Sequence, residues 1–217
     1  MMKLSTTCVL LVVSGIAVGT TRAQFDEAWH RVPSVVVISA REDPRLGLVD
    51  EAVAFWNRTL AELGSGFRLG PVEHLVKPVP EDALQALSRS IVDHPLGPLE
   101  IPSSLRHPPG DLTVFLSDSD LISFTGPFDR KDRCIVGIRG RDVPPLNLPN
   151  VARNVITHEI GHALGLVHNS DPTTLMCGRP ASCRPALFRS DEPRLFPLTE
   201  DDRRRLLEMY PSNWKPR

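Results

Sequence analysis

The segment HEIGHALGLVH, residues 158–168, constrains the fold more strongly than any other part of the sequence. His158 and His162 are four residues apart, so on a helix they share one face and lie about 6 Å apart along the axis. Two imidazoles at this spacing can bind one metal ion, and neutral imidazole is a good ligand for zinc. Glu159 projects at a neighbouring angle, from which its carboxylate can reach a metal-bound water without being a ligand.

The position of His168 predicts where this helix ends. On a continuous helix, His168 would lie about 15 Å along the axis from His158 and could not share its metal. The helix must therefore end between His162 and His168. Gly165 stands at the required place, since glycine adopts the left-handed conformation that ends many helices. Gly161 lies between the first two histidines and predicts that another group packs closely against the helix.

A site of three histidines predicts amide hydrolysis. It leaves one tetrahedral position for a water, whose pKa zinc lowers toward about 7. Glu159 can take the proton of this water and pass it to a leaving amine. The other histidines show no such spacing, and we interpret them as ordinary surface or core residues: His30, His74, His94 and His107.

The rest of the chain predicts an α+β domain with one twisted, mixed β-sheet and helices packed on it. Apolar, β-branched runs predict strands over 33–40, 110–117 and 133–140. A weaker strand is expected over 67–75, where Pro71 interrupts the run, and an edge strand near 121–125.

Apolar residues at helical spacing predict further helices over 44–64, 81–92 and 198–210. Asn150 is a good N-cap for the helix that carries the histidines. In the last helix, Thr199 with Asp202 three residues later resembles a capping box. No repeat or second domain is evident.

Residues 1–23 have the layout of a secretory signal peptide. Lys3 supplies positive charge, residues 9–19 are apolar, and residues 21–23 resemble a cleavage site. The alternative is an uncleaved anchor, but the apolar run is shorter than the roughly 20 residues that span a membrane. We therefore expect no stable membrane anchor, one domain over 24–217 and a secreted, extracellular or periplasmic location.

The charge of the mature chain excludes some partners. Removal of residues 1–23 takes away Lys3 and Arg22 and no acid, which leaves 23 basic and 26 acidic residues, a net charge of −3. This balance gives no reason to expect nucleic acid or an anionic membrane as a partner. We expect a monomer that acts on a polypeptide.

Three cysteines remain in the mature chain, and an exported protein can form a disulfide. Cys177 and Cys183 flank a short loop and are the easiest pair. Cys134 would then be buried or free, although its pairing with one of the other two is a competing possibility.

The segment HEIGHALGLVH matches the extended zinc signature of the metzincin metallopeptidases, H-E-x-x-H-x-x-G-x-x-H. The following HNSDPTTLM, residues 168–176, resembles the matrixin branch, the matrix metalloproteinase family. The sequence LTEDDRRRLLEMY, residues 198–210, also resembles the last helix of that family. Over 33–157, the resemblance is one of element order.

This resemblance implies a zincin-like catalytic domain, with Glu159 as general base and acid and a catalytic zinc held by His158, His162 and His168. It also implies that a peptide substrate lies extended and pairs with the edge strand near 121–125, as in β-augmentation. A zinc-binding but catalytically silent binding protein is the alternative function. Glu159 favours the enzyme, because a silent relative often loses this residue.

Other implications of the resemblance concern the surroundings of the metal. Met176 would form a hydrophobic base under the metal, and Asp201 would tie the last helix to that turn. The chain reads CGRP after Met176, where matrixins usually carry Pro-x-Tyr, so pocket specificity is not predicted. Four acidic residues could bind calcium, although we favour a solvated loop: Asp118, Asp120, Asp129 and Asp132.

Overall fold

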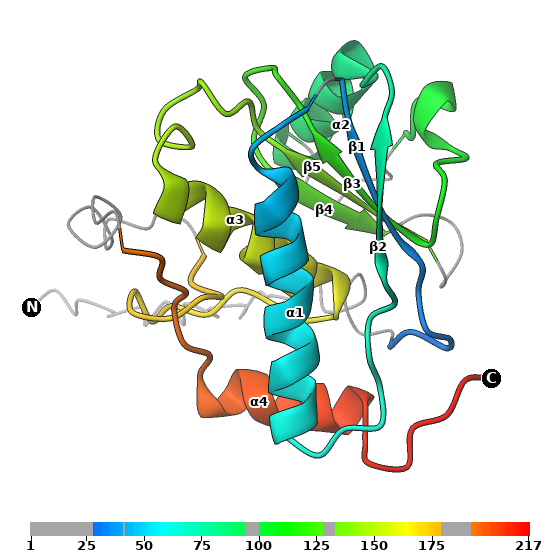
Figure 1. The fold of residues 1–217 in the computed structure, drawn as a ribbon, viewed down its shortest axis with the longest axis vertical. Helices are drawn as coiled ribbons and strands as arrows, with labels where there is room; N and C mark the ends of the chain where they lie inside the picture. Colours follow the sequence, from blue (N-terminus) through cyan, green and yellow to red (C-terminus); the bar gives the residue numbers. More distant parts are fainter. Residues whose placement is uncertain (1–27, 41, 94–99, 128–132, 179–191) are drawn as a thin grey trace, which may run out of the picture.

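The computed structural model describes residues 28–40, 42–93, 100–127, 133–178 and 192–217. Its centre is a five-stranded sheet with strand order β2-β1-β3-β5-β4 (Figure 1). Parallel pairing joins β2 (Val72–Val76), β1 (Val35–Ser39), β3 (Leu112–Leu116) and β5 (Cys134–Ile138). The edge strand β4 (Phe124–Pro127) pairs antiparallel with β5. The fold is therefore α+β, as the sequence predicts.

The sequences of the strands follow from their places in the sheet. Every residue of β1, β3 and β5 is buried, because inner parallel strands are covered on both faces and read as continuous apolar runs. The edge strand β2 begins directly after Pro71 and is partly exposed. The predicted edge strand is present as β4, a few residues later than the expected 121–125.

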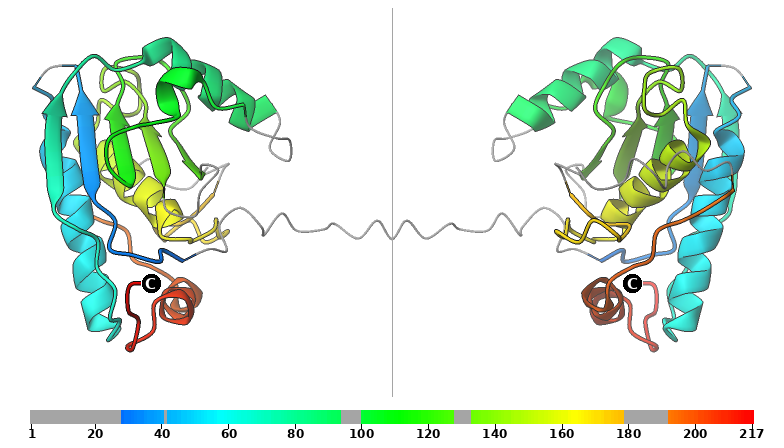
Figure 2. Two further views of the ribbon diagram at one scale, coloured as in Figure 1. Left: turned by 90° about the vertical axis from the view of Figure 1, so that its right-hand side faces the viewer. Right: turned by 90° about the vertical axis from the view of Figure 1, so that its left-hand side faces the viewer.

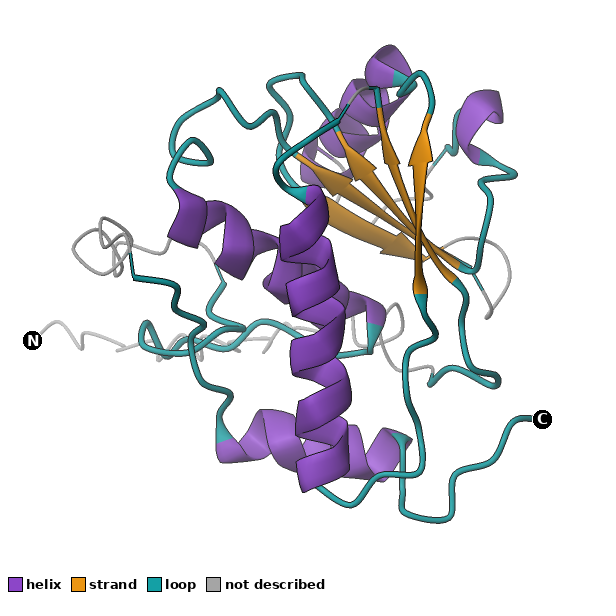
Figure 3. Cartoon of the chain, viewed as in Figure 1, coloured by secondary structure: helices purple, strands orange, loops and turns teal. Residues whose placement is uncertain are grey.

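Helices cover both faces of the sheet (Figures 1, 2 and 3). One face carries α1 (Leu46–Glu62) and α3 (Pro149–Ala163), and the other carries α2 (Glu81–Asp93). The strands alternate between two apolar clusters. Val35 and Val37 face α1 and α3, whereas Val36 and Ile38 join the cluster that contains residues of α2. The last helix, α4 (Glu200–Met209), packs against the first cluster through Leu206.

The helix ends confirm one capping prediction and correct another. At the start of α4, the Thr199 side chain accepts a hydrogen bond from the Asp202 backbone and the Asp202 carboxylate accepts one from the Thr199 backbone, which is the expected capping box. Asn150 is not the N-cap of α3. Leu148 occupies that position and Pro149 begins the helix, since a proline suits the first turn.

In the part of the chain that the structure describes, no helix is long and apolar enough to cross a membrane. The signal peptide predicted over residues 1–23 lies outside the described residues. Its cleavage before Gln24 therefore stays a prediction.

A buried ion pair joins the start of α1 to the ends of two strands. The Arg45 guanidinium donates to both carboxylate oxygens of Asp43 and to the backbone carbonyls of Ser117 (2.8 Å) and Arg139 (2.6 Å). Burial of the carboxylate raises the pKa of Asp43, but hydrogen bonds and charge from Arg45 outweigh it and hold this pKa below its ordinary value. The resulting stabilisation is present above about pH 4 and is lost as the pH falls through the folded-state pKa.

We expect Arg45→Met to lower the free energy of unfolding by about 3–5 kcal/mol, because it leaves the Asp43 carboxylate buried without its partner. Urea denaturation followed by circular dichroism measures this change. Arg204→Met is the matched control, since the ion pairs of Arg204 are exposed, and it should change stability by less than about 0.5 kcal/mol. Equal effects of the two substitutions would contradict the structural role of Arg45.

Candidate metal centre

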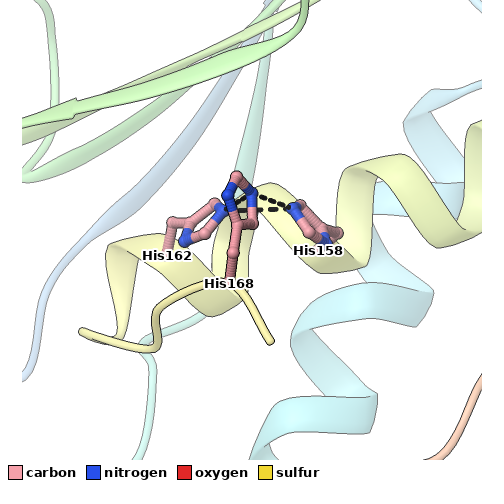
Figure 4. A group of neighbouring side chains, drawn as sticks. All are labelled: His158, His162 and His168. Carbon is pink, nitrogen blue, oxygen red and sulfur yellow. Dashed lines mark hydrogen bonds between the residues drawn. The ribbon is translucent and has the colours of Figure 1, made fainter. Parts of the chain in front are cut away.

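The three predicted histidines converge on one point (Figure 4). His158 and His162 come from α3 and His168 from the segment that follows its end. The Nε2 atom of His162 lies 3.0 Å from that of His158 and 2.9 Å from that of His168, and the remaining Nε2–Nε2 distance is 3.2 Å. His162 is buried, whereas His168 is exposed, so the site opens toward solvent on the His168 side.

Backbone carbonyls orient the two helical imidazoles. The Nδ1 atom of His158 lies 2.7 Å from the carbonyl oxygen of Leu175, and Nδ1 of His162 lies 2.8 Å from that of Leu166. A carbonyl only accepts, so each Nδ1 carries the proton and each Nε2 presents a lone pair. Burial, followed by the nearby His158 and His168, lowers the pKa of His162 well below its ordinary value. This imidazole is therefore neutral, as a metal ligand must be.

This geometry fits zinc. Lone pairs that face one another at such short distances repel unless a cation lies between them. Tetrahedral nitrogen ligands at the usual zinc distance lie about 3.3 Å apart, close to the separations in this cluster. Among the described residues, His158, His162 and His168 are the group whose side chains could hold a metal ion.

The helix ends where the sequence predicts. Gly165 has a φ of 92°, in the left-handed region, directly after the cap residue Leu164. The N–H of Gly165 donates to the carbonyl of His162 (2.9 Å), and the N–H of Leu166 donates to that of Gly161 (3.0 Å). These two bonds form the Schellman motif, which redirects the chain and brings His168 to the other imidazoles.

Side chains from both ends of the described chain stabilise this bend. The indole N–H of Trp29 donates to the carbonyl of residue 163 (2.9 Å), and the Tyr210 hydroxyl donates to that of residue 164 (3.2 Å). The guanidinium of Arg205, in α4, donates to the carbonyl of Gly165 (2.8 Å). The last carbonyls of a helix have no partner within it, so these distant donors satisfy the groups that the bend leaves open.

The predicted close packing at Gly161 involves the predicted methionine. Met176 is fully buried, and a Cβ atom on Gly161 would lie 2.7 Å from its sulfur and 2.8 Å from Cζ2 of Trp56. Asn169 donates its N–H to the carbonyl of Met176 (2.8 Å), which closes the turn after His168. Met176 therefore lies against the helix between the first two histidines.

The structure corrects the tie between α4 and this turn by one residue. Asp201 is exposed and its carboxylate pairs with Arg204. The neighbouring Asp202 is buried and accepts a hydrogen bond from the Asn169 side chain (3.2 Å). The physical reason is that Asp202 caps α4. Its carboxylate accepts the backbone N–H of Thr199 and therefore points away from solvent, toward Asn169 in the turn.

Glu159 is 7% exposed and lies under the edge strand β4. The hydroxyl of Thr125, in β4, lies 2.8 Å from Oε2 of Glu159 and 2.7 Å from its backbone oxygen. No local pattern in the sequence links Thr125 to Glu159, because the two residues are 34 positions apart.

The remaining predictions have mixed outcomes. Cys183 lies outside the described residues, so its pairing with Cys177 stays a prediction, whereas Cys134 is a buried free thiol. Of the four acidic residues considered for calcium, Asp129 and Asp132 also lie outside the described residues, and Asp120 forms an ion pair with Arg139. Among the described residues, no group of acidic side chains supports a calcium site.

One family model matches the part of the chain that carries the histidine cluster. The matrixin family of peptidases matches residues 127–211, less than half of the chain but a range that contains all three histidines, Glu159 and Met176. The crystal structure of archaemetzincin from Methanopyrus kandleri is similar to this chain with a TM-score of 0.49 and 19% identity, over 83% of this chain and 96% of that one. The matrixin match confirms the metzincin-type resemblance over its range and supports a zinc metallopeptidase.

We expect Gly161→Ala to lower the free energy of unfolding by about 1–2 kcal/mol, because crowding against Met176 and Trp56 exceeds the gain in helix propensity. Gly47→Ala is the matched control, since Gly47 lies in α1 with open space around it and should gain up to about 1 kcal/mol. Urea denaturation of the two zinc-free variants and the zinc-free parent measures these changes in the free energy of unfolding. A stabilised Gly161→Ala variant would contradict the close packing.

Proposed function

We propose that the protein is a secreted zinc-dependent endopeptidase in which Glu159 acts as general base and acid. The observation that supports this most strongly is the convergence of three Nε2 atoms at 2.9–3.2 Å from one another, with the Glu159 carboxylate on the same helix. A silent zinc-binding protein needs the histidines but not this carboxylate. Export and a monomeric state are proposed from the sequence.

In this proposal, some side chains would hold the metal ion and another would transfer protons. The three imidazoles would hold zinc, which supplies Lewis-acid chemistry when bound. The carbonyls of Leu175 and Leu166 keep the imidazoles of His158 and His162 in the required tautomer. The Glu159 carboxylate accepts a proton from the attacking water and delivers it to the leaving amine nitrogen.

We propose that the substrate is a polypeptide that binds extended along β4. This strand is the edge of the sheet next to β5, and its Thr125 hydroxyl contacts Glu159 of α3. A peptide that adds as a further strand would be held through backbone hydrogen bonds beside the reacting groups. Cleavage of a mixed peptide library, assayed with and without a zinc chelator, would identify the sequence of the preferred substrate.

Glu159→Gln should lower kcat/KM for a peptide selected from that library by about 10²–10⁴-fold, because an amide cannot accept the proton. Its zinc content, measured by atomic emission, should equal that of the parent. Glu62→Gln, at an exposed position in α1, is the control and should cleave normally. Equal rates for the parent and Glu159→Gln would exclude the general-base role, and no cleavage by the zinc-loaded parent would favour the silent binding protein.

His168→Ala should weaken zinc binding by more than about 100-fold, since the loss of partners that merely orient ligands already costs 10–100-fold. Competition with a chromogenic chelator measures this affinity directly. His74→Ala, on the opposite edge strand β2, should bind zinc like the parent. Retention of parental affinity by His168→Ala would show that His168 is not a ligand.

A further inference from the structure

The hydroxyl of Thr125 bridges the edge strand to the proposed general base. It lies within hydrogen-bonding distance of two oxygens of Glu159, the carboxylate Oε2 at 2.8 Å and the backbone carbonyl at 2.7 Å. Both residues are buried, with 8% and 7% of their surfaces exposed. Inside the protein, a hydrogen bond between such groups is stronger than in water.

A hydroxyl has one proton, and the carboxylate is the stronger acceptor. Donation to Oε2 of Glu159 is charge-assisted, and bonds of this kind are about twice as strong as neutral ones. Threonine is also restricted at χ1 by its branched Cβ, so the hydroxyl direction is largely set by the strand. The position of β4 thus controls the position of one carboxylate oxygen.

The placement of β4 is itself fixed by packing on the opposite face of the sheet. Phe124, the neighbour of Thr125, belongs to the cluster that includes α2, and it lies opposite Gly137 of β5. A Cβ atom at Gly137 would lie 2.4 Å from the Phe124 ring, so the ring fills the space that this glycine leaves. Successive side chains of a strand point to opposite faces, and this contact therefore directs Thr125 toward α3.

We propose that Thr125 is a positioning residue that orients the Glu159 carboxylate for proton transfer. This inference rests on the proposed function, because orientation matters for catalysis only if Glu159 moves the proton. Thr125 does not need to contact the substrate, since a peptide added to β4 would pair with the strand backbone. The hydroxyl should therefore affect kcat far more than KM.

The test compares Thr125→Val, which keeps the shape and removes the donor, with Thr125→Ser, which keeps the hydroxyl. We expect Thr125→Val to lower kcat about 10–100-fold with KM unchanged within about twofold, because misplacement of a reacting group by about 1 Å costs rate on this scale. Thr125→Ser should have a kcat within about threefold of that of the parent. Both variants should keep the parental zinc content.

Thr113→Val controls for the general loss of a buried hydroxyl. Thr113 is fully buried in β3, and its hydroxyl donates to the carbonyl of Pro109, away from the histidines. This variant should lose stability without losing kcat. If Thr125→Val is likewise destabilised but keeps the parental kcat, Thr125 is merely structural and the proposal is wrong.

Crystal structures of the zinc-free parent, Thr125→Val and Thr125→Ser separate this proposal from the proposed function. We expect the Glu159 carboxylate to leave its parental rotamer in the valine variant and to keep it in the serine variant. An unchanged rotamer in Thr125→Val would overturn the positioning role, even if the parent is an active peptidase. If the zinc-loaded parent cleaves no peptide, the proposed function fails, whereas a shifted rotamer would still show that Thr125 orients the carboxylate.

Discussion

The place where α3 ends is the constraint on which the metal centre depends. The left-handed conformation at Gly165 redirects the chain, and this change of direction brings His168 to the two helical imidazoles. The same bend has a second effect. It releases the carbonyl of Leu166 from helical bonding, and this carbonyl accepts the Nδ1 proton of His162. One glycine therefore positions His168 and helps to orient His162.

The bend in turn depends on parts of the chain that supply no ligand. Three successive carbonyls at the end of α3 accept hydrogen bonds from Trp29, Tyr210 and Arg205, which lie near the two ends of the described chain. The Trp29 backbone N–H also donates to the Tyr210 hydroxyl (3.3 Å), so two of these donors support each other. The packing of α4 and of the first described residues thus contributes to the geometry of the metal site.

The features that the sequence predicts correctly depend on residues within a few positions of one another. The convergence of His158, His162 and His168, the helix end at Gly165 and the capping box at Thr199 are of this kind. The features that the sequence does not reveal are contacts between distant elements. Thr125 meets Glu159 across 34 positions, and the Asp202 carboxylate, whose capping role is local, also meets Asn169 across 33 positions.

The buried polar residues of α3 show why these distant pairs matter for function. Asn150 and Asn154 bond to the backbone of residues 192–196, and Glu159 bonds to β4 on another side of the helix. Apolar contacts set the rotation of a helix only coarsely, because the hydrophobic effect is non-directional. Hydrogen bonds are directional, and catalytic groups must be held to within about 0.5 Å. These hydrogen bonds of α3 therefore refine the rotation that aligns its two histidines and its carboxylate. A substitution of Asn150 or Asn154 can disturb the site without changing any of the three histidines.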